Sequence, residues 1–313
     1  FQSGHKYDLD RGGMKKILLT LILAIFFISP EVLRAYDFSA SGGVIAVSRP
    51  LYEGADENEI DFLPLIDITL GKSFFVNVEK GLGVYLMKNR VLEFGTSVGY
   101  YESRLERDST KLTGLGDIDS GIDGRIFAKI NIYDYSLSFQ LQSDLSENHD
   151  GTLLIVGAGY SYGQHTDVNW NLKATMTFVN TNYMDTYFGV TSAQSSRSGI
   201  TAYNTKGGLK DLAINSIISR DFDRHWSLKG VVGYKRLLGD ADASPLVDGL
   251  GSEHQFQFGR HFAAGPFGQI GGRALRPRAS RKCARRADRR RRSEGLRSHS
   301  SGQTGWNGYG KPR

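Results

Sequence analysis

The segments Asp211-Leu-Ala-Ile-Asn-Ser-Ile-Ile-Ser219 and Trp226-Ser-Leu-Lys-Gly-Val-Val-Gly-Tyr-Lys235 decide the fold, because apolar and polar residues alternate along both. A short polar break, residues 221–225, separates them. The apolar residues of one face occupy the even positions: Leu212, Ile214, Ile218, Trp226, Leu228, Val232 and Tyr234. Alternation over about ten residues, with aromatic residues at the ends, is typical of a membrane-spanning strand with one face in lipid and one toward a lumen. The two segments are therefore predicted to be neighbouring strands of a transmembrane β-barrel.

The same alternation recurs through residues 36–259, which are predicted to form a single barrel. It is most regular in residues 135–142, where apolar residues alternate with Ser and Gln without exception. The twelve predicted strands span residues 38–48, 61–70, 74–78, 81–87, 92–101, 121–132, 135–145, 152–162, 170–178, 209–220, 226–238 and 254 onward. The break at Glu79-Lys80 is short, so ten or fourteen strands are the alternatives.

The predicted connections alternate in length, apart from Glu79-Lys80. Those after odd-numbered strands are long or acidic: residues 49–60, 102–120, 146–151, 180–208 and 239–253. Those after even-numbered strands are shorter: residues 71–73, 88–91, 133–134, 163–169 and 221–225. Bacterial outer-membrane barrels have short periplasmic turns, longer external loops and an even number of strands. The sequence therefore predicts an all-β, antiparallel transmembrane barrel of about 12 strands in the outer membrane of a Gram-negative bacterium.

The end of the barrel departs from this pattern. Every backbone N–H and C=O group facing lipid must be paired, so the last strand has to meet the first. The segment His254-Gln-Phe-Gln-Phe-Gly259 begins regularly, but Arg260 opens an Arg-rich sequence. An Arg on the lipid face at mid-bilayer costs roughly 2 to 4 kcal/mol. We therefore expect a truncated twelfth strand, a barrel ending at residue 259, and an aberrant tail over residues 260–313.

The two ends of the chain are expected to lie outside the barrel. Residues 1–13 precede Met14 without an interpretable pattern and are interpreted as upstream sequence or a cloning remnant. Residues 14–35 are predicted to be a signal peptide, with Lys15 and Lys16 before an apolar stretch, residues 17–28, and cleavage after Ala35. The stretch is too short for a membrane helix, which needs about 20 apolar residues.

The tail also dominates the charge. Residues 260–313 hold fifteen Lys and Arg against two acids, so they carry +13, which leaves −7 for the rest of a chain whose total is +6. One interpretation is a patch for nucleic acid or anionic lipid. The favoured interpretation is that the tail is a disordered segment translated in a shifted reading frame, because an exported barrel has no access to nucleic acid. The only cysteine, Cys283, lies there, so the predicted barrel has no disulfide or thiolate site.

Two short clusters could carry chemistry, and each has a plainer explanation. Asp117, Asp119 and Asp123 are spaced so that they could wrap a hard cation, but they also suit a solvated acidic strand end without an EF-hand pattern. Ser146, His149 and Asp150 contain the residue types of a hydrolase, but proximity in sequence is not triad geometry, and such a segment is usually a turn. We expect no catalytic residue, metal or cofactor.

The connection over residues 180–208 is the longest and has the most distinctive sequence. It holds Tyr183, Tyr187 and Phe188, followed by Arg197-Ser198-Gly199. Long loops are often functional, and aromatic residues with an arginine suit a contact surface or a constriction within the lumen. An ordered loop that covers the barrel is the equal alternative.

Several motifs, in order along residues 38–258, resemble the MipA/OmpV family. They are Gly114-Leu-Gly116-Asp117-Ile-Asp119, Tyr183-Met-Asp-Thr-Tyr187-Phe188-Gly189-Val-Thr191, Arg197-Ser198-Gly199, Gly208-Leu-Lys-Asp211, Tyr234-Lys-Arg-Leu-Leu-Gly239-Asp240-Ala241 and Ser244-Pro245-Leu-Val247. The resemblance implies an outer-membrane barrel without enzymatic activity, embedded in outer-membrane lipid. The name-giving member, MltA-interacting protein, is described as a scaffold that brings a murein lytic transglycosylase to a penicillin-binding protein, which implies the same partners here. The alternative is a channel for small solutes.

Overall fold

The computed structural model describes residues 38–163, 168–222 and 226–270. By contacts the chain divides into residues 1–271 and 272–313, and the second unit lies outside the described residues. The predicted upstream residues 1–13, the signal peptide 14–35, and the tail from residue 271, with Cys283, are likewise outside them.

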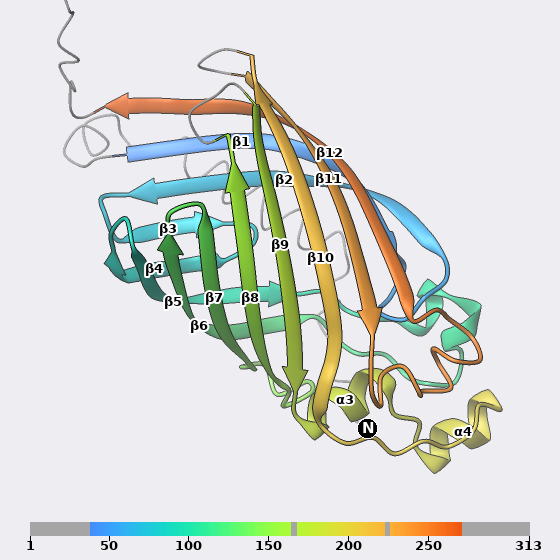
Figure 1. The fold of residues 1–313 in the computed structure, drawn as a ribbon. Coiled ribbons are helices and arrows are strands. Elements are labelled where there is room, and N and C mark those ends of the chain that lie inside the picture. The colour runs from blue at the N-terminus through green and yellow to red at the C-terminus, as the bar shows by residue number, and fades with distance from the viewer. Residues whose placement is uncertain (1–37, 164–167, 223–225, 271–313) are drawn as a thin grey trace, which may run out of the picture. The chain divides into compact units, whose positions relative to one another are not determined.

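The described part forms a closed antiparallel barrel of twelve strands, as the alternation predicted (Figure 1). Each strand pairs with its neighbours in the chain, and the last pairs with the first. The strands are β1 (Phe38–Pro50), β2 (Asn58–Leu70), β3 (Phe74–Asn77), β4 (Gly81–Lys88), β5 (Leu92–Tyr101), β6 (Gly121–Ile132), β7 (Tyr135–Asp144), β8 (Thr152–Tyr162), β9 (Val168–Val179), β10 (Gly208–Asp221), β11 (Trp226–Leu237) and β12 (His254–Ile270). Two 3-10 turns and two helices lie in the connections: η1 (Glu106–Asp108), η2 (Thr110–Leu112), α3 (Thr181–Phe188) and α4 (Ser192–Ser198).

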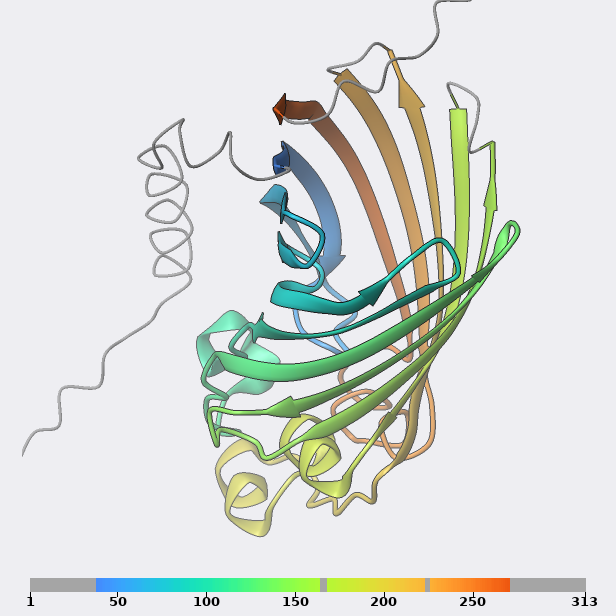
Figure 2. The same cartoon turned by 90° about the vertical axis from the view of Figure 1, so that its left-hand side faces the viewer.

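The expectation of a truncated twelfth strand is wrong. β12 continues to Ile270 and pairs with both β1 and β11, so it closes the barrel beyond Arg260 (Figure 2). Arg260 lies opposite Ala46 on β1 and Gly230 on β11. Ladder hydrogen bonds are made by the backbone, so a change in side-chain type does not end the strand, whereas an open edge would leave a row of unpaired groups.

The two faces of the sheet carry the residues that the alternation assigned to them. On β5, Phe94 and Val98 are exposed on the outside, and Gly95 and Ser97 are buried on the inside. Outward side chains remain largely uncovered by protein, for example Ile60 at 71% and Phe62 at 67% exposure. An apolar outer face next to a polar inner face is the pattern expected when lipid surrounds a barrel.

The inner face is partly filled. Phe75, Tyr85 and Phe127 meet in the lumen, with ring centroids 4.6 to 5.8 Å apart. The ammonium group of Lys80 lies over the rings of Tyr85 and Phe127, at 5.2 and 5.3 Å from their centroids. The lumen beside β3, β4 and β6 is thereby occupied by aromatic side chains.

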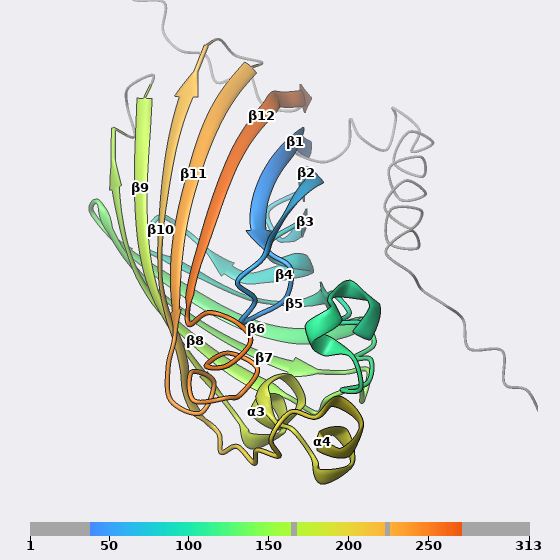
Figure 3. The ribbon, with the colours of Figure 1, turned by 90° about the vertical axis from the view of Figure 1, so that its right-hand side faces the viewer.

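The two ends of the barrel differ as predicted. The short turns lie at one end, and the long connections, with α3 and α4, lie at the other (Figures 1 and 3). The turn at Glu79-Lys80 falls on the long-loop side and stays short. No helix among the described residues is long and apolar enough to cross a membrane.

Candidate functional site

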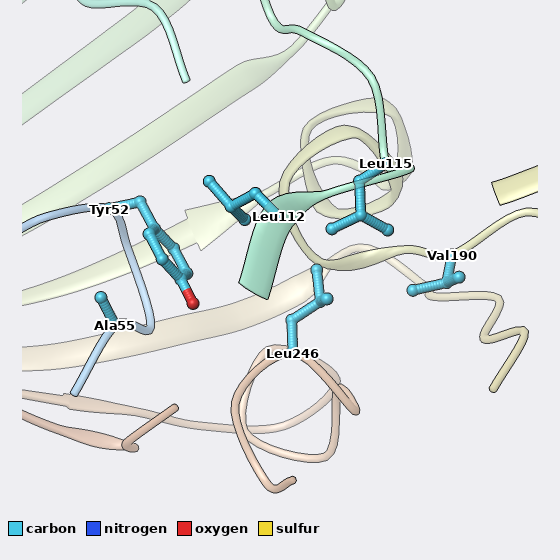
Figure 4. Packing of buried hydrophobic residues seen from close by; sticks show 6 residues of the cluster. All are labelled: Tyr52, Ala55, Leu112, Leu115, Val190 and Leu246. Carbon is cyan, nitrogen blue, oxygen red and sulfur yellow. The ribbon is translucent and has the colours of Figure 1, made fainter. Parts of the chain in front are cut away.

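The long connections form one structure, which we call the cap: residues 51–57, 102–120, 145–151, 180–207 and 238–253. These loops leave different sides of the barrel and contact one another (Figure 3). A buried apolar cluster joins four of them: Tyr52, Ala55, Leu112, Leu115, Val190 and Leu246 (Figure 4). Burial of such side chains contributes about 25 cal/mol per Å² of apolar area, so the cap has a small hydrophobic core of its own.

A second apolar cluster fixes α3 beneath the loops. The helix begins after Asn180, whose side chain accepts a hydrogen bond from the Tyr183 N–H, as expected for an N-cap. Met184 and Phe188 are four residues apart, so they share one helix face, and both are completely buried. They pack with Val179, Leu237, Ala241 and Val247.

A charge cluster around the buried ammonium of Lys210 ties the cap to the barrel wall. The Glu53 carboxylate lies 2.5 Å from the Lys210 ammonium and 3.0 Å from that of Lys235. It also accepts a 3.2 Å hydrogen bond from the Tyr183 hydroxyl. Burial raises the pKa of Glu53, but attraction to the two lysines outweighs burial, so its pKa lies well below the ordinary value. Glu53 is therefore ionised at neutral pH.

Lys210 reaches this cluster because β10 is irregular. The register shifts between Leu209 and Asp211 on pairing with β9, so Lys210 and Asp211 are both buried. Asp211 lies 3.2 Å from the Lys210 ammonium and accepts a 2.9 Å hydrogen bond from the Thr177 hydroxyl. A bulge inserts one residue and turns a side chain that strict alternation would send outward.

The His149 ring lies among three tyrosine rings. Its ring is 4.8 Å from Tyr101, 5.7 Å from Tyr183 and 5.6 Å from Tyr187. Its Nδ1 accepts a 2.9 Å hydrogen bond from the Gly151 N–H. Burial lowers the pKa of His149, although nearby carboxylates oppose the shift. The imidazole is therefore neutral near pH 7 and acts as a packed acceptor.

Three other members of the two short clusters, Ser146, Asp117 and Asp123, also make structural contacts. The Ser146 hydroxyl accepts a 2.9 Å hydrogen bond from the Ile122 N–H. Asp117 accepts one from the Glu106 N–H at 2.8 Å, and the Asp123 carboxylate pairs with the Arg125 guanidinium. In the part of the chain that the structure describes, no group of three or more His, Cys, Asp or Glu residues is placed to hold a metal ion.

The motif residues Gly114 to Asp119 and Arg197 to Gly199 join loop 102–120 to loops 145–151 and 180–207. The Gly116 N–H donates to Glu106, and the Asp119 carbonyl accepts from Asn148 at 3.3 Å. Arg197 donates from Nε to the Gly114 carbonyl at 3.1 Å. Ser198 bonds back to the Gln194 carbonyl at 2.8 Å, and Gly199 ends α4 with φ +75°.

The motif residues of the long connection and of the last loop meet around α3. Tyr183 and Tyr187 stack with ring centroids 4.5 Å apart, and Phe188 is completely buried. Ser244 is also completely buried; its hydroxyl donates to the Phe188 carbonyl at 2.6 Å and lies in the turn that includes Pro245.

Gly189 and the start of the last loop complete this junction. The Gly189 N–H donates to the Asp185 carbonyl at 3.0 Å and ends α3. Asp240 accepts from the Lys206 N–H at 2.6 Å, and Gly239, with φ +60°, opens the turn. The motif residues thus converge on the cap from separate loops.

Sequence reasoning missed the groups that anchor the cap. Glu53 and Arg104 were not singled out, and Lys210 and Asp211 appeared only as parts of a motif and of a strand, with no role assigned. A lysine and an aspartate side by side at the start of a predicted strand break the alternation, and that break was the available signal. For Glu53 and Arg104 no local pattern in the sequence marks burial.

Beneath the cap, a cavity of about 410 Å³ lies against the inner faces of β10, β11 and β12. Its charged lining consists of Arg49, Glu53, Glu102, Arg104 and Lys235. Arg49 is paired with Asp61 at 2.7 Å and with Glu102 at 2.6 Å. Gln255 and Gln257 contribute amide groups.

A closed antiparallel barrel of twelve strands, with an apolar exterior, a polar interior and loops unequal at its two ends, defines an outer-membrane barrel protein. A family model described as MltA-interacting protein MipA matches residues 42–263, and the chain belongs to this family. This confirms the resemblance drawn from the motifs.

Comparison with solved structures finds barrels of low similarity. Neisserial surface protein A is 10% identical, with 73% of this chain and 96% of that chain covered and a TM-score of 0.24. An outer membrane channel from Pseudomonas putida F1 is 10% identical, with coverages of 74% and 95% and a TM-score of 0.37. OmpT of Vibrio cholerae is 7% identical, with coverages of 74% and 98% and a TM-score of 0.33. No curated protein matches the chain.

Proposed function

We propose that this protein is a non-enzymatic scaffold of the outer membrane that links a murein lytic transglycosylase to a penicillin-binding protein during peptidoglycan remodelling. The cap is the observation that carries the proposal. Four of the five long loops are tied across one end of the barrel by two apolar clusters and by the Glu53 cluster, and the fifth, residues 145–151, is joined to them by the Asn148 amide. A barrel closed in this way at one end suits a rigid scaffold better than an open pore.

Family membership supports the choice of partners, because the family model is described by its interaction with MltA. The non-enzymatic part is supported by the contacts of Ser146 and His149, whose hydroxyl and Nδ1 both accept backbone hydrogen bonds. Export by the signal peptide of residues 14–35 and contact with outer-membrane lipid over the apolar exterior belong to the same proposal.

The short-turn end is the surface that we assign to the partners, because in outer-membrane barrels this end faces the periplasm, where murein lies. Lys72 and Arg90 are exposed there, in the turns after β2 and β4. Lys206, which is exposed in the cap, gives a matched position at the opposite end. Charge reversal at the two ends therefore separates a periplasmic contact from an external one.

The test is affinity capture from envelopes with the tagged full chain. Lytic transglycosylase and penicillin-binding protein are expected with the wild type and with Lys206→Glu, and in reduced amount with Lys72→Glu/Arg90→Glu. Heat-dependent gel mobility checks that each variant is a folded barrel. Absence of both enzymes from the wild-type capture contradicts the proposal, and equal losses in the two variants contradict the assignment of the surface.

A channel for small solutes is the second candidate, favoured by the polar inner face and by the cavity under the cap. Planar-bilayer recordings distinguish the two. A channel shows steady conductance in the wild type, whereas the capped scaffold conducts only when the cap is destabilised.

A further inference from the structure

We propose that the cavity beneath the cap binds a small solute with a carboxylate and a second hydrogen-bond acceptor, the carboxylate at Arg104 and the acceptor at the Gln255 amide. This site is separate from the scaffold role, because it lies within the barrel near the cap and away from the short turns.

Arg104 is the first observation. It lines the cavity, is only 8% exposed, and comes from the start of the loop between β5 and β6. Its Nη1 donates to the Tyr187 carbonyl at 2.7 Å and its Nη2 to the Thr186 carbonyl at 3.5 Å. Both carbonyls belong to the last turn of α3, where a cation is favourable but meets only about half an elementary charge.

Arg104 is not fully balanced by these contacts. A guanidinium has five N–H donors, and two carbonyls do not satisfy five. Among the described residues its electrostatic partners are tyrosines, and no carboxylate pairs with it. A buried charge without an opposite charge is costly, so a bound carboxylate would offset a cost that the folded protein already carries.

Gln255 is the second, independent observation. It comes from β12, points to the inside, lines the same cavity and is 6% exposed. Its Nε2 is buried and has no hydrogen-bond partner among the described residues. A buried donor left unpaired loses its hydration without compensation, so a hydrogen bond to an acceptor in the cavity would offset that cost.

The other charged groups of the cavity are already paired and therefore narrow the ligand class. Arg49 is engaged by Asp61 and Glu102, and Lys235 by Glu53. Arg49 and Lys235 are therefore not free to bind a second negative group on the ligand. The carboxylates of Glu53 and Glu102 would repel such a group. A volume of about 410 Å³ falls within the range of small-molecule sites, roughly 300 to 1,000 Å³. The cavity thus fits a small monocarboxylate better than a multiply charged anion.

The experiment uses the full chain, folded in nonionic detergent, with N-acetylglycine as the probe and N-acetylglycinamide as the uncharged probe of the same shape. Titration calorimetry or ligand-observed NMR is expected to show saturable binding of the acid and at least tenfold weaker binding of the amide, since a hydrogen bond to a charged group supports such a ratio.

Variants separate the site from a general effect on the lumen. Arg104→Met is expected to weaken N-acetylglycine binding at least tenfold. Because this change also removes two contacts to α3, Gln255→Leu is the second variant; it removes an unpaired donor and should weaken binding several-fold without loss of the folded barrel. Gln140→Leu is the matched control, because Gln140 faces the lumen from β7 and does not line the cavity.

The proposal is overturned if the wild type shows no saturable binding of N-acetylglycine, if the amide binds equally well, or if Gln140→Leu weakens binding as much as Gln255→Leu. Because none of these readouts involves murein enzymes, failure here leaves the scaffold proposal standing, and failure of partner capture leaves this site standing.

Discussion

Replacement of Glu53 by Gln tests whether one carboxylate anchors the cap. In the wild type this group serves Lys210, Lys235 and the Tyr183 hydroxyl at once, and the Lys210 side chain is only 4% exposed. Removal of one partner from a buried ion pair costs about 3 to 5 kcal/mol. Lys210 keeps Asp211 at 3.2 Å, so we expect a loss at the lower end, about 3 kcal/mol.

The assay is urea unfolding of the barrel in lipid vesicles, followed by tryptophan fluorescence and by gel mobility without boiling. Limited proteolysis of the cap runs in parallel, because a cap with its own core can open before the barrel does. The control is Glu57→Gln in the same loop, where the side chain is exposed, and a change of less than about 0.5 kcal/mol is expected there.

The pH dependence checks the same group. The folded pKa of Glu53 is lowered, so its contribution is complete above the unfolded value of about 4.3 and is lost as the pH falls toward the folded pKa. The difference between wild type and Glu53→Gln should be constant from neutral pH to about pH 5 and should shrink below it. A Glu53→Gln loss no larger than that of Glu57→Gln would refute the view that this carboxylate anchors the cap.

Three further changes probe the cap. Gly114 and Gly116 both have φ +87°, but a Cβ would meet the backbone of Arg197 and Ser198 at 2.8 to 2.9 Å only at Gly114. The free energy of unfolding should therefore fall by about 1 to 2 kcal/mol in Gly116→Ala and by clearly more in Gly114→Ala. Equal losses in the two variants would contradict this packing. Ser244→Ala should cost about 1 to 3 kcal/mol, because it leaves the buried Phe188 carbonyl without its donor, whereas Ser192→Ala on exposed α4 serves as the control. Because the pKa of His149 is lowered, its contribution is complete above the unfolded value of about 6.5 and is lost as the pH falls below it toward the folded pKa. His149→Gln should therefore flatten the unfolding profile below about pH 6.5, and an unchanged slope would assign that slope to other groups.

The alternation of β5 and β7 was sufficient to predict their faces, because a strand exposes successive side chains to opposite sides whatever its neighbours are. The lengths of the connections were likewise sufficient to predict which end carries the loops. The end of β12 was not predictable in this way. Its continuation beyond Arg260 depends on pairing with the edges of β1 and β11. β1 lies far from β12 in the sequence, and the two meet only when the barrel closes.

The motifs identified the correct segments without their roles. Tyr183, Ser198, Gly199, Asp240 and Ser244 lie in loops whose local sequence suits turns and caps, and so their presence in the cap was within reach of sequence reasoning. Their hydrogen bonds were not, since Ser244 meets Phe188 across 56 residues.

By itself the sequence determined the class of fold, the faces of the strands and which end of the barrel carries the long loops. These features follow from period-two patterning and loop length along neighbouring residues. Only the tertiary structure decided that the loops close into a cap, that Glu53 holds Lys235 from 182 positions away, and that Arg104 and Gln255 share a cavity. Those contacts join segments from opposite sides of the barrel, and nothing in the pattern of one segment records which distant segment barrel closure brings beside it.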